Sequence, residues 1–296
     1  MTDVGSPTPS SNCPRELEGK VCLVTGGGNG LGAASALGLA AAGARVVLCD
    51  RDPAGLSATA GDIAYRWGAE RVVAICADVT LERDVEGAVQ LAHKTFGRVD
   101  ILLNNAGTGP QIVRPDYFSK PLHCWEIPLD KWRQIIEVNA IAPFAFARSV
   151  LPGMVARRWG RVINISTTWE TMLRSGFASY GPSKAALESM TVAMARELMG
   201  TGVTVNTLHP GGPVDTAQVP SDIGVPRERL LRPEVMVPAL VWLCSDKAVD
   251  FSGQRLTAAH WKASATQADN LQAAAEPAGW PQLVRPIVMP DRGRLN

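Results

Sequence analysis

A tyrosine and a lysine four residues apart, Tyr180 and Lys184, have a spacing that suggests chemistry. Residues four apart on a helix share one face, so the phenol and the ammonium group lie close together. A free tyrosine has a pKa near ~10, and a neighbouring ammonium group favours the phenolate. Lowering that pKa by about three units takes roughly 4 kcal/mol of differential stabilisation. The pair therefore suggests an acid–base centre, but the spacing is common on exposed helices and needs support from the rest of the chain.

The stretch from Lys20 to Ala44 predicts a strand, a glycine-rich turn and a helix. Residues 21–24 are an uninterrupted apolar run, as in a strand buried on both faces, and apolar residues then recur at helical spacing. The first N–H groups of such a helix are unpaired, and the helix dipole adds positive charge, so the turn attracts a phosphate. Residues without a Cβ let a pyrophosphate approach the backbone; here they are Gly26, Gly28, Gly30 and Gly32.

Asp50 ends the second predicted strand, about twenty residues after the glycine turn. A carboxylate at this point accepts hydrogen bonds from an adenosine ribose diol and repels a 2′-phosphate, which favours NAD over NADP. Arg51 is the counter-argument, because a guanidinium group beside the site accommodates that phosphate.

Strands alternate with helices along the chain, which predicts an α/β fold. Right-handed crossovers then give one doubly wound parallel sheet with helices on both faces. The predicted strands are 21–24, 45–49, 71–76, 101–103, 161–165, 204–208 and 254–258, and the later helices are 53–67, 80–96 with Thr80 as N-cap, 129–159, 179–200 and 233–245.

The chain divides into three parts by composition. Residues 1–16 are rich in Ser, Pro and Thr and are predicted to be a disordered tail. Residues 17–261 form the catalytic domain, and residues 262–296 are a C-terminal extension without clear periodicity. Two long loops, 108–128 and 211–232, follow strands at the predicted ligand edge, and we expect the second to act as a lid.

Over residues 17–261 the chain resembles the classical short-chain dehydrogenase/reductases. The matching motifs are Thr25-Gly26-Gly27-Gly28-Asn29-Gly30-Leu31-Gly32, Asp78-Val79, Asn104-Asn105-Ala106-Gly107, Asn139, Tyr180-Gly181-Pro182-Ser183-Lys184 and Pro210-Gly211. The resemblance implies a Rossmann fold, a nicotinamide cofactor and hydride transfer between that cofactor and a carbonyl or alcohol carbon.

The resemblance also implies residue roles. Tyr180 would be the acid–base, and Lys184 would hold the nicotinamide ribose and lower the tyrosine pKa. Asn139 would hold the water of a proton relay. The remaining cofactor contacts would come from the motif residues Gly26, Gly28, Asn29, Gly30, Leu31, Gly32, Asp50, Arg51, Asp78, Val79, Asn105, Ala106, Gly107, Pro210 and Gly211.

The chain departs from the family pattern at Thr167. The family places a substrate-orienting serine thirteen residues before the tyrosine, and that position is Thr167 here. Threonine keeps the hydroxyl donor but adds a methyl group and stiffens χ1. Ser166 is the weaker candidate for the same role, because it points to the opposite side if the strand continues.

Apolar residues in three loops offer walls for a largely apolar or cyclic alcohol or ketone. Trp169 and Val214 join Thr167 and Tyr180 as expected substrate contacts. The further wall candidates are Tyr117, Phe118, Trp125, Met172, Leu173, Val219 and Ile223. Several of these residues would equally well pack a lid onto the body.

Composition excludes several other classes. A net charge of +1 argues against a nucleic-acid binder, which would need a basic stripe. We expect no membrane partner, because no apolar run reaches the length of a transmembrane helix. The six cysteines form no CxxC pair, and there is no apolar signal core, which together predict a cytoplasmic protein without a metal site. Apolar residues in excess of one stripe predict a homodimer or homotetramer; they include Phe144, Phe146, Met190 and Met194, with Trp280, Leu283 and Val284 in the tail.

Three functions stay open on the sequence. The first is an NAD(P)-dependent oxidoreductase that acts on a secondary alcohol or ketone. The second is a dinucleotide-binding sensor or scaffold without turnover, which only the serine-to-threonine change supports. The third is a lyase or epimerase that retains NAD tightly and produces no net NADH.

Overall fold

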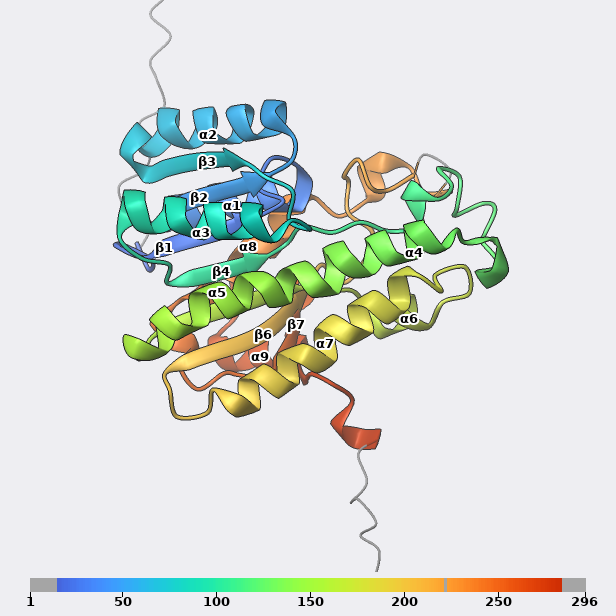
Figure 1. Cartoon of the computed structure of the whole chain (residues 1–296). Helices are drawn as coiled ribbons and strands as arrows, with labels where there is room; N and C mark the ends of the chain where they lie inside the picture. The colour runs from blue at the N-terminus through green and yellow to red at the C-terminus, as the bar shows by residue number, and fades with distance from the viewer. Residues whose placement is uncertain (1–14, 221–222, 284–296) are drawn as a thin grey trace, which may run out of the picture.

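The computed structural model describes residues 15–220 and 223–283. Within them, strands and helices alternate around one sheet (Figure 1). The strands are β1 (Val21–Thr25), β2 (Arg45–Asp50), β3 (Val72–Cys76), β4 (Ile101–Asn104), β5 (Gly160–Ile165), β6 (Val203–His209), β7 (Gln254–Thr257) and β8 (Ala275–Pro277). The helices are α1 (Gly30–Ala41), α2 (Pro53–Trp67), α3 (Glu82–Phe96), α4 (Leu129–Ile136), α5 (Ala142–Ala156), α6 (Trp169–Leu173), α7 (Tyr180–Glu197), α8 (Val237–Cys244) and α9 (Gln267–Ala274).

The strands lie in the order β3-β2-β1-β4-β5-β6-β7-β8. Strands β1 to β7 are parallel. Successive strands are added on one side of β1 up to β3 and on its other side from β4 onward, so the strand order reverses between β1 and β4. The predicted α/β, doubly wound sheet is confirmed. One strand was not predicted: β8, within the C-terminal extension, runs antiparallel to β7. Its three residues carry no apolar alternation, so nothing local marks them as a strand.

Apolar side chains fill both sides of the sheet. Every residue of β1, β4, β5 and β6 is buried, which explains the apolar runs at residues 21–24 and 101–103. Strands β5 and β6 also bury polar side chains, among them Arg161 and Asn206. Helices α1, α2 and α8 pack on one face, and α3, α5 and α7 pack on the other. Leu17, which directly follows the predicted disordered tail, is fully buried. Residues 1–14 of that tail and residues 284–296 lie outside the described residues.

The predicted long helix at 129–159 is α4 and α5 joined by a π-helical turn, Glu137–Ile141. Contrary to our expectation, Leu129–Ala156 is long and apolar enough to span a membrane by length and composition. Its inner face, however, carries Phe146, Val150 and Met154 into the core against α3 and the sheet. Packing on the sheet therefore explains the apolar residues of the inner face, whereas Leu129, Ile141, Phe144 and Val155 are partly exposed.

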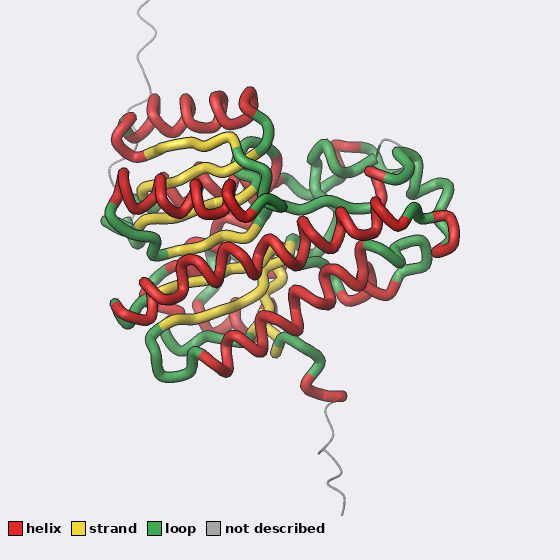
Figure 2. Tube along the Cα trace, in the orientation of Figure 1, coloured by secondary structure: helices red, strands yellow, loops and turns green. Residues whose placement is uncertain are grey.

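A lobe projects from the carboxyl ends of the strands (Figures 1 and 2). It comprises α4, α6 and the loops that follow β4, β5 and β6. In the described part of the predicted lid 211–232, Asp215 pairs with Arg227 at 2.7 Å and with Arg232 at 2.7 Å. The described part of this loop is therefore held by ion pairs.

Thr80 is not the N-cap of α3, which begins at Glu82 after Leu81. The Asp78 carboxylate accepts hydrogen bonds from the N–H and the hydroxyl of Thr80, at 2.9 and 2.7 Å. This local Asx turn draws Thr80 away from the helix, and the Asp84 side chain accepts from Asp78 N instead.

Candidate active site

The predicted site residues gather at the carboxyl edge of the sheet, where the loops after β1, β2, β4, β5 and β6 meet (Figure 1). Parallel strands bring their carboxyl ends to one edge, so segments far apart in sequence become neighbours there. The site is best described from the glycine turn toward Tyr180.

Two glycines of the turn are required by packing within the protein. A Cβ on Gly26, whose φ is +65°, would lie 2.8 Å from Asn105 Nδ2, and one on Gly32 would lie 1.8 Å from the Gly26 carbonyl oxygen. We had assigned all four glycines to phosphate approach. For Gly26 and Gly32, close contact between the turn, α1 and the β4 loop is already a sufficient reason.

Asn105 holds the glycine turn from the neighbouring strand. Its Nδ2 donates to the carbonyl oxygens of Thr25 and Gly26, at 2.9 and 3.1 Å. In return, Thr25 Oγ1 accepts from the backbone N–H groups of Asn105 and Ala106, both at 3.0 Å. Asn105 and Ala106 thus fix the shape of the turn.

The N-terminus of α1 is left open to a ligand. Asn29 is its N-cap, but the Asn29 side chain donates to Asp52 Oδ2 at 2.8 Å and forms no cap with the described residues. The first turn, which starts with Gly30 and Leu31, carries no acidic side chain. Unpaired N–H groups in a first turn that carries no acidic side chain of its own suit a pyrophosphate, so this turn fits the dinucleotide that the sequence implied.

Asp50 lies beside that turn. Its Oδ2 accepts from Gly28 N at 2.9 Å, and its Oδ1 accepts from Asp52 N at 3.1 Å. Arg51 is exposed and forms no ion pair with the described residues. Asp78 shapes the loop after β3, and the side chain of Val79 packs partly against the core under it.

Tyr180 begins α7, and the side chain of Thr167 lies close enough to its phenol to favour the phenolate by hydrogen bonding. Burial raises the pKa of Tyr180 to about 12, with the Thr167 hydrogen bond opposing that rise and Tyr117 adding to it. In the protein alone, burial outweighs the hydrogen bond from Thr167, and the lowering of this pKa by Lys184 stays a prediction.

Lys184 lies one turn further along α7, with its Nζ 5.9 Å from the centre of the Tyr180 ring. It donates to the Ile165 carbonyl oxygen at 2.8 Å and has no carboxylate partner among the described residues. Burial lowers the pKa of Lys184 to about 8. A lysine with one of its three donors engaged retains donors for a ribose hydroxyl.

Asn139 sits fully buried in the π-helical turn between α4 and α5. Its Nδ2 donates to Thr108 O at 2.8 Å and to Ser183 Oγ at 2.9 Å, while its Oδ1 accepts from Thr108 N at 2.9 Å. Asn139 therefore connects the loop after β4 to the helix that carries Tyr180 and Lys184. The π-helical turn left no signal in the sequence, although such turns recur at functional sites.

The two hydroxyls after β5 point to different partners. Ser166 donates to Glu188 Oε2 at 3.1 Å, whereas the Thr167 side chain bonds to Tyr180. Trp169 donates weakly to Glu188 Oε1 at 3.4 Å, and Arg255 Nη2 donates to the Thr167 carbonyl oxygen at 2.9 Å. Our sequence reasoning missed Glu188 and Arg255, because neither belongs to a local motif.

Aromatic rings extend from Tyr180 into the lobe. Phe177 packs edge-on against Tyr180 at 6.1 Å between ring centres, and Tyr117 packs against Phe177 at 5.8 Å. Phe118 continues the row beside Tyr117. Two other wall candidates are largely exposed to solvent: Trp125 is 79% exposed and Leu173 is 86% exposed.

The lid reaches across the edge toward the glycine turn. Gln218 Nε2 donates to the Gly107 carbonyl oxygen at 2.7 Å, and the Thr216 methyl group lies over Gly30. At the base of the lid, Pro210 O accepts from Ala259 N, and Gly211 adopts a φ of +93°. Val214 is buried and pairs with Leu231, so the structure gives this expected substrate contact a packing position.

Residues 20–222 match the family model for short chain dehydrogenases. The chain belongs to this family. It is 33% identical over 248 residues to the 3-oxoacyl-(acyl-carrier-protein) reductase FabG of Vibrio cholerae, covering 81% of this chain and 96% of that protein. It is also 33% identical over 246 residues to the 2,5-dichloro-2,5-cyclohexadiene-1,4-diol dehydrogenase LinX of Sphingobium indicum, covering 80% of this chain and 93% of that protein.

Solved structures give the same family. A 3-ketoacyl-(acyl-carrier-protein) reductase of Brucella melitensis complexed with NADH superposes with a TM-score of 0.69 at 32% identity, over 80% of this chain and 95% of that one. A Beutenbergia cavernae protein described as a gluconate 5-dehydrogenase with bound NADP superposes with a TM-score of 0.71 at 33% identity, over 83% and 97%. The family and its Rossmann fold are thus established, and the chain is an NAD(P)-dependent oxidoreductase.

Proposed function

We propose that this protein interconverts a secondary alcohol and the corresponding ketone, with Tyr180 as the acid–base. The observation that carries the proposal is that the side chains of Thr167 and Tyr180 approach each other beside the Lys184 ammonium. Two hydroxyls directed at one point can hold a carbonyl oxygen on which negative charge develops.

Each residue then has a defined task. A nicotinamide, when bound, supplies or accepts the hydride at the substrate carbon. Tyr180 keeps its proton at neutral pH, because burial raises its pKa, and so can deliver that proton to the substrate oxygen. Thr167 donates a second hydrogen bond to the same oxygen, and the free donors of Lys184 hold the cofactor ribose. Asn139 keeps the loop and helix of the site in register.

We further propose that NAD is the better cofactor. Asp50 supports this, because its carboxylate is held by Gly28 N beside the turn and would repel a 2′-phosphate. Arg51 is the opposing residue, since its guanidinium group is exposed and unpaired within the described chain. The solved relatives do not decide, because one is described with NADH and another with NADP.

The proposed substrate is largely apolar or cyclic, with Thr167, Trp169 and Tyr180 as contacts. The aromatic row of Phe177 and Tyr117 supports this, and one relative is named for a cyclohexadienediol.

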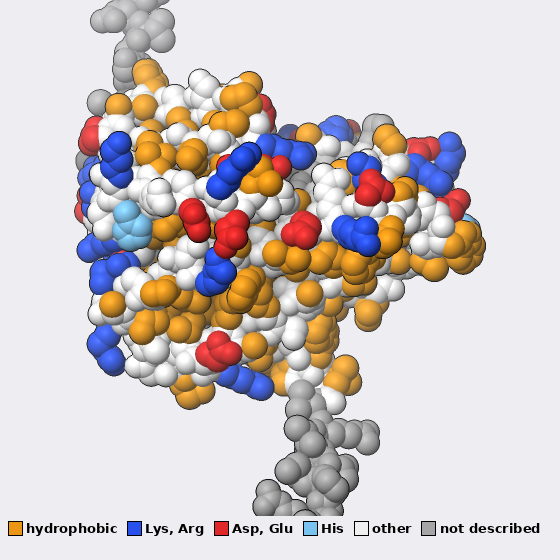
Figure 3. All heavy atoms as spheres, in the orientation of Figure 1, with side chains coloured by type: hydrophobic (Ala, Val, Ile, Leu, Met, Phe, Trp, Pro, Cys, Tyr) orange, Lys and Arg blue, Asp and Glu red, His pale blue; other side chains and the backbone are white. Residues whose placement is uncertain are grey.

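We also propose a cytoplasmic homodimer or homotetramer. Hydrophobic side chains lie along α4, α5 and α7 on the face in Figure 3. Of the apolar residues in this helical segment, Ile141 and Phe144 are about half exposed. Phe146 and Met194, which we had counted toward this surface, are instead buried in the core. Val284 lies outside the described residues.

A panel of secondary alcohols and ketones, tested with NAD, NADH, NADP and NADPH, tests the function. We expect turnover on apolar cyclic members, and in Tyr180→Phe a loss of about 10²–10⁴ in kcat, the usual contribution of general acid–base catalysis, with cofactor binding little changed. Cofactor binding is measured by nicotinamide fluorescence. Full activity in Tyr180→Phe would refute the proposed role, and tight cofactor binding without turnover on any member would indicate a binding protein.

A further inference from the structure

A buried ion pair lies directly beneath the residues that follow β5. Glu188 of α7 and Arg255 of β7 are 0% and 2% exposed, and Arg255 Nη1 lies 3.1 Å from Glu188 Oε1. Glu188 is one helical turn after Lys184, so the pair adjoins the catalytic face of α7. Nothing in the hydride-transfer scheme itself requires these two charges.

Two further polar atoms of the pair contact the site. Arg255 Nη2 donates to the Thr167 carbonyl oxygen at 2.9 Å, and Glu188 Oε2 accepts from Ser166 Oγ at 3.1 Å. The Trp169 indole lies against both: its Nε1 is 3.4 Å from Glu188 Oε1, and its ring centre is 4.4 Å from the Arg255 guanidinium carbon. Three residues that closely follow β5 are thus held by a single pair of charges.

Holding a strand to a helix through a buried ion pair costs free energy. Moving two charges out of water costs several kcal/mol per ion, and apolar residues of the same volume often stabilise a fold as well or better. The pair is also imperfectly satisfied, because Arg255 Nε has no hydrogen-bond partner among the described residues and only a distant carboxylate, Glu276 of β8 at 4.0 Å. Packing alone therefore does not account for it.

We propose that Glu188 and Arg255 are positioning residues that fix the backbone at Thr167, so that the Thr167 hydroxyl meets the Tyr180 phenol. The β-branched Thr167 has few χ1 choices, so the direction of its hydroxyl follows the backbone closely. A guanidinium group that holds the carbonyl of the same residue sets that direction. This inference rests on the proposed role of Thr167, and it assigns the device that supports it.

The hydrogen bond at Tyr180 can be observed without turnover. The chain has three tyrosines, Tyr65, Tyr117 and Tyr180, so a protein labelled with ¹³C at the tyrosine Cζ gives three signals, which Tyr→Phe variants assign. We expect Arg255→Met to move the Tyr180 signal to the position that it has in Thr167→Val. The matched control is Arg161→Met, which removes another buried arginine stacked at 4.4 Å on a tryptophan, and which should leave the signal unchanged.

Kinetics then test the consequence. Misplacing a catalytic group by about 1 Å can cost 10²-fold, so we expect Arg255→Met to lower kcat about 10- to 100-fold with cofactor affinity within about twofold. Adding Arg255→Met to Thr167→Val should lower kcat by less than about a further twofold, because the effects of substitutions at residues that act through one another are not additive. Arg255→Lys, which keeps a donor and the charge, should restore part of the loss.

An unpaired carboxylate in Arg255→Met could unfold the protein. The double variant Glu188→Met/Arg255→Met removes both charges and reads the same signal and rates. An unmoved Tyr180 signal in the folded variant, or a loss in kcat that adds in full to that of Thr167→Val, would overturn the inference. A moved signal in a protein that turns over no alcohol or ketone would support the positioning role and reject the proposed function instead.

Discussion

Two buried arginines, one near the amino ends of the parallel strands and one near their carboxyl ends, have different partners. Arg161 of β5 and Arg255 of β7 are 0% and 2% exposed, and each guanidinium carbon lies 4.4 Å from the centre of a tryptophan ring. Arg255 has a carboxylate partner and a bond to Thr167. Arg161 has neither among the described residues, and donates to the carbonyl oxygens of Gly160, Gly202 and Ser245.

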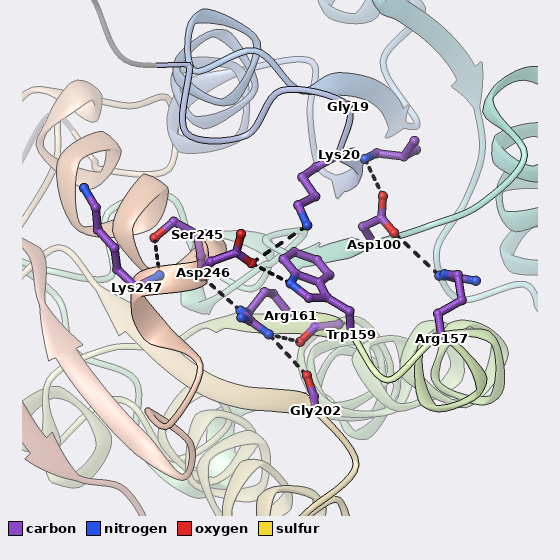
Figure 4. Close-up of polar contacts among 12 residues, drawn as sticks. Gly19, Lys20, Asp100, Arg157, Trp159, Arg161, Gly202, Ser245, Asp246 and Lys247 are labelled. Carbon is purple, nitrogen blue, oxygen red and sulfur yellow. Dashed lines mark hydrogen bonds and ion pairs between the residues drawn. The ribbon is translucent and has the colours of Figure 1, made fainter.

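The residues around Arg161, at the amino ends of the strands, contact one another. Figure 4 shows the Trp159 ring between Lys20 and Arg161, with its Nε1 donating to Asp246 at 2.7 Å. Lys20 lies 3.9 Å from the same carboxylate. These contacts join loops that carry no predicted site residue, whereas Arg255 donates to the carbonyl oxygen of Thr167, a predicted site residue. Since parallel strands place ligand sites at the carboxyl edge, substitutions at the two edges should differ in kind.

Among the substitutions that test this comparison, Thr167→Val should have the largest effect. It keeps the shape and removes a hydroxyl that would stabilise the developing charge, so the rate should fall about 10²–10³-fold with stability nearly unchanged. Thr167→Ser retains the donor and should keep most of the activity. Ser166→Ala should matter much less, because the Ser166 hydroxyl faces Glu188. Steady-state kcat measures all three variants, and a larger loss in Ser166→Ala than in Thr167→Val would reverse our assignment of the two hydroxyls.

The second effect is on stability and depends on pH. Burial lowers the pKa of Lys184 to about 8, so folding must bury a charge below pH 8 and need not do so as the pH rises toward the unfolded value near ~10.5. The penalty from Lys184 should fall by up to about 3 kcal/mol over this interval. Denaturant unfolding of the cofactor-free wild type and of Lys184→Met, at pH 7.5 and pH 10, measures it. A difference between the two proteins that stays constant with pH would contradict the shift.

Arg161→Met should affect stability alone. Its loss leaves the carbonyl groups of Gly160, Gly202 and Ser245 without this donor, and an unpaired buried polar group costs about 1–3 kcal/mol. The free energy of unfolding should fall by about that amount, with kcat within about twofold of wild type. A loss of turnover comparable to that in Arg255→Met would break the contrast between the two edges.

The smallest effect should come from Asp50→Asn. The amide oxygen can still accept from Gly28 N, but the charge that repels a 2′-phosphate is gone. The ratio of kcat/KM with NAD to that with NADP should fall about tenfold, which corresponds to about 1.4 kcal/mol. The control is Arg51→Gln, which should leave NAD use unchanged. A wild-type preference for NADP that Arg51→Gln abolishes would show that Arg51 outweighs Asp50.

The sequence by itself determined the sheet, the turn and the helix that carries Tyr180 and Lys184. Strands buried on both faces read as apolar runs, and an i, i+4 pair on a helix lies on one face in any fold. The same local logic placed Asp50 beside the glycine turn, where the structure has it. These features depend on neighbours along the chain, so their periodicity and spacing are visible without coordinates.

Only the tertiary structure decided what surrounds those residues. Glu188 and Arg255 are 67 residues apart, and no local pattern joins them. The pKa of Tyr180 rises because protein from several segments buries it, a sum that no spacing reports. Gly26 and Gly32 are needed because Asn105 and the turn itself approach so closely. Periodicity reports which side of an element is buried, whereas desolvation and long-range pairing depend on which elements meet.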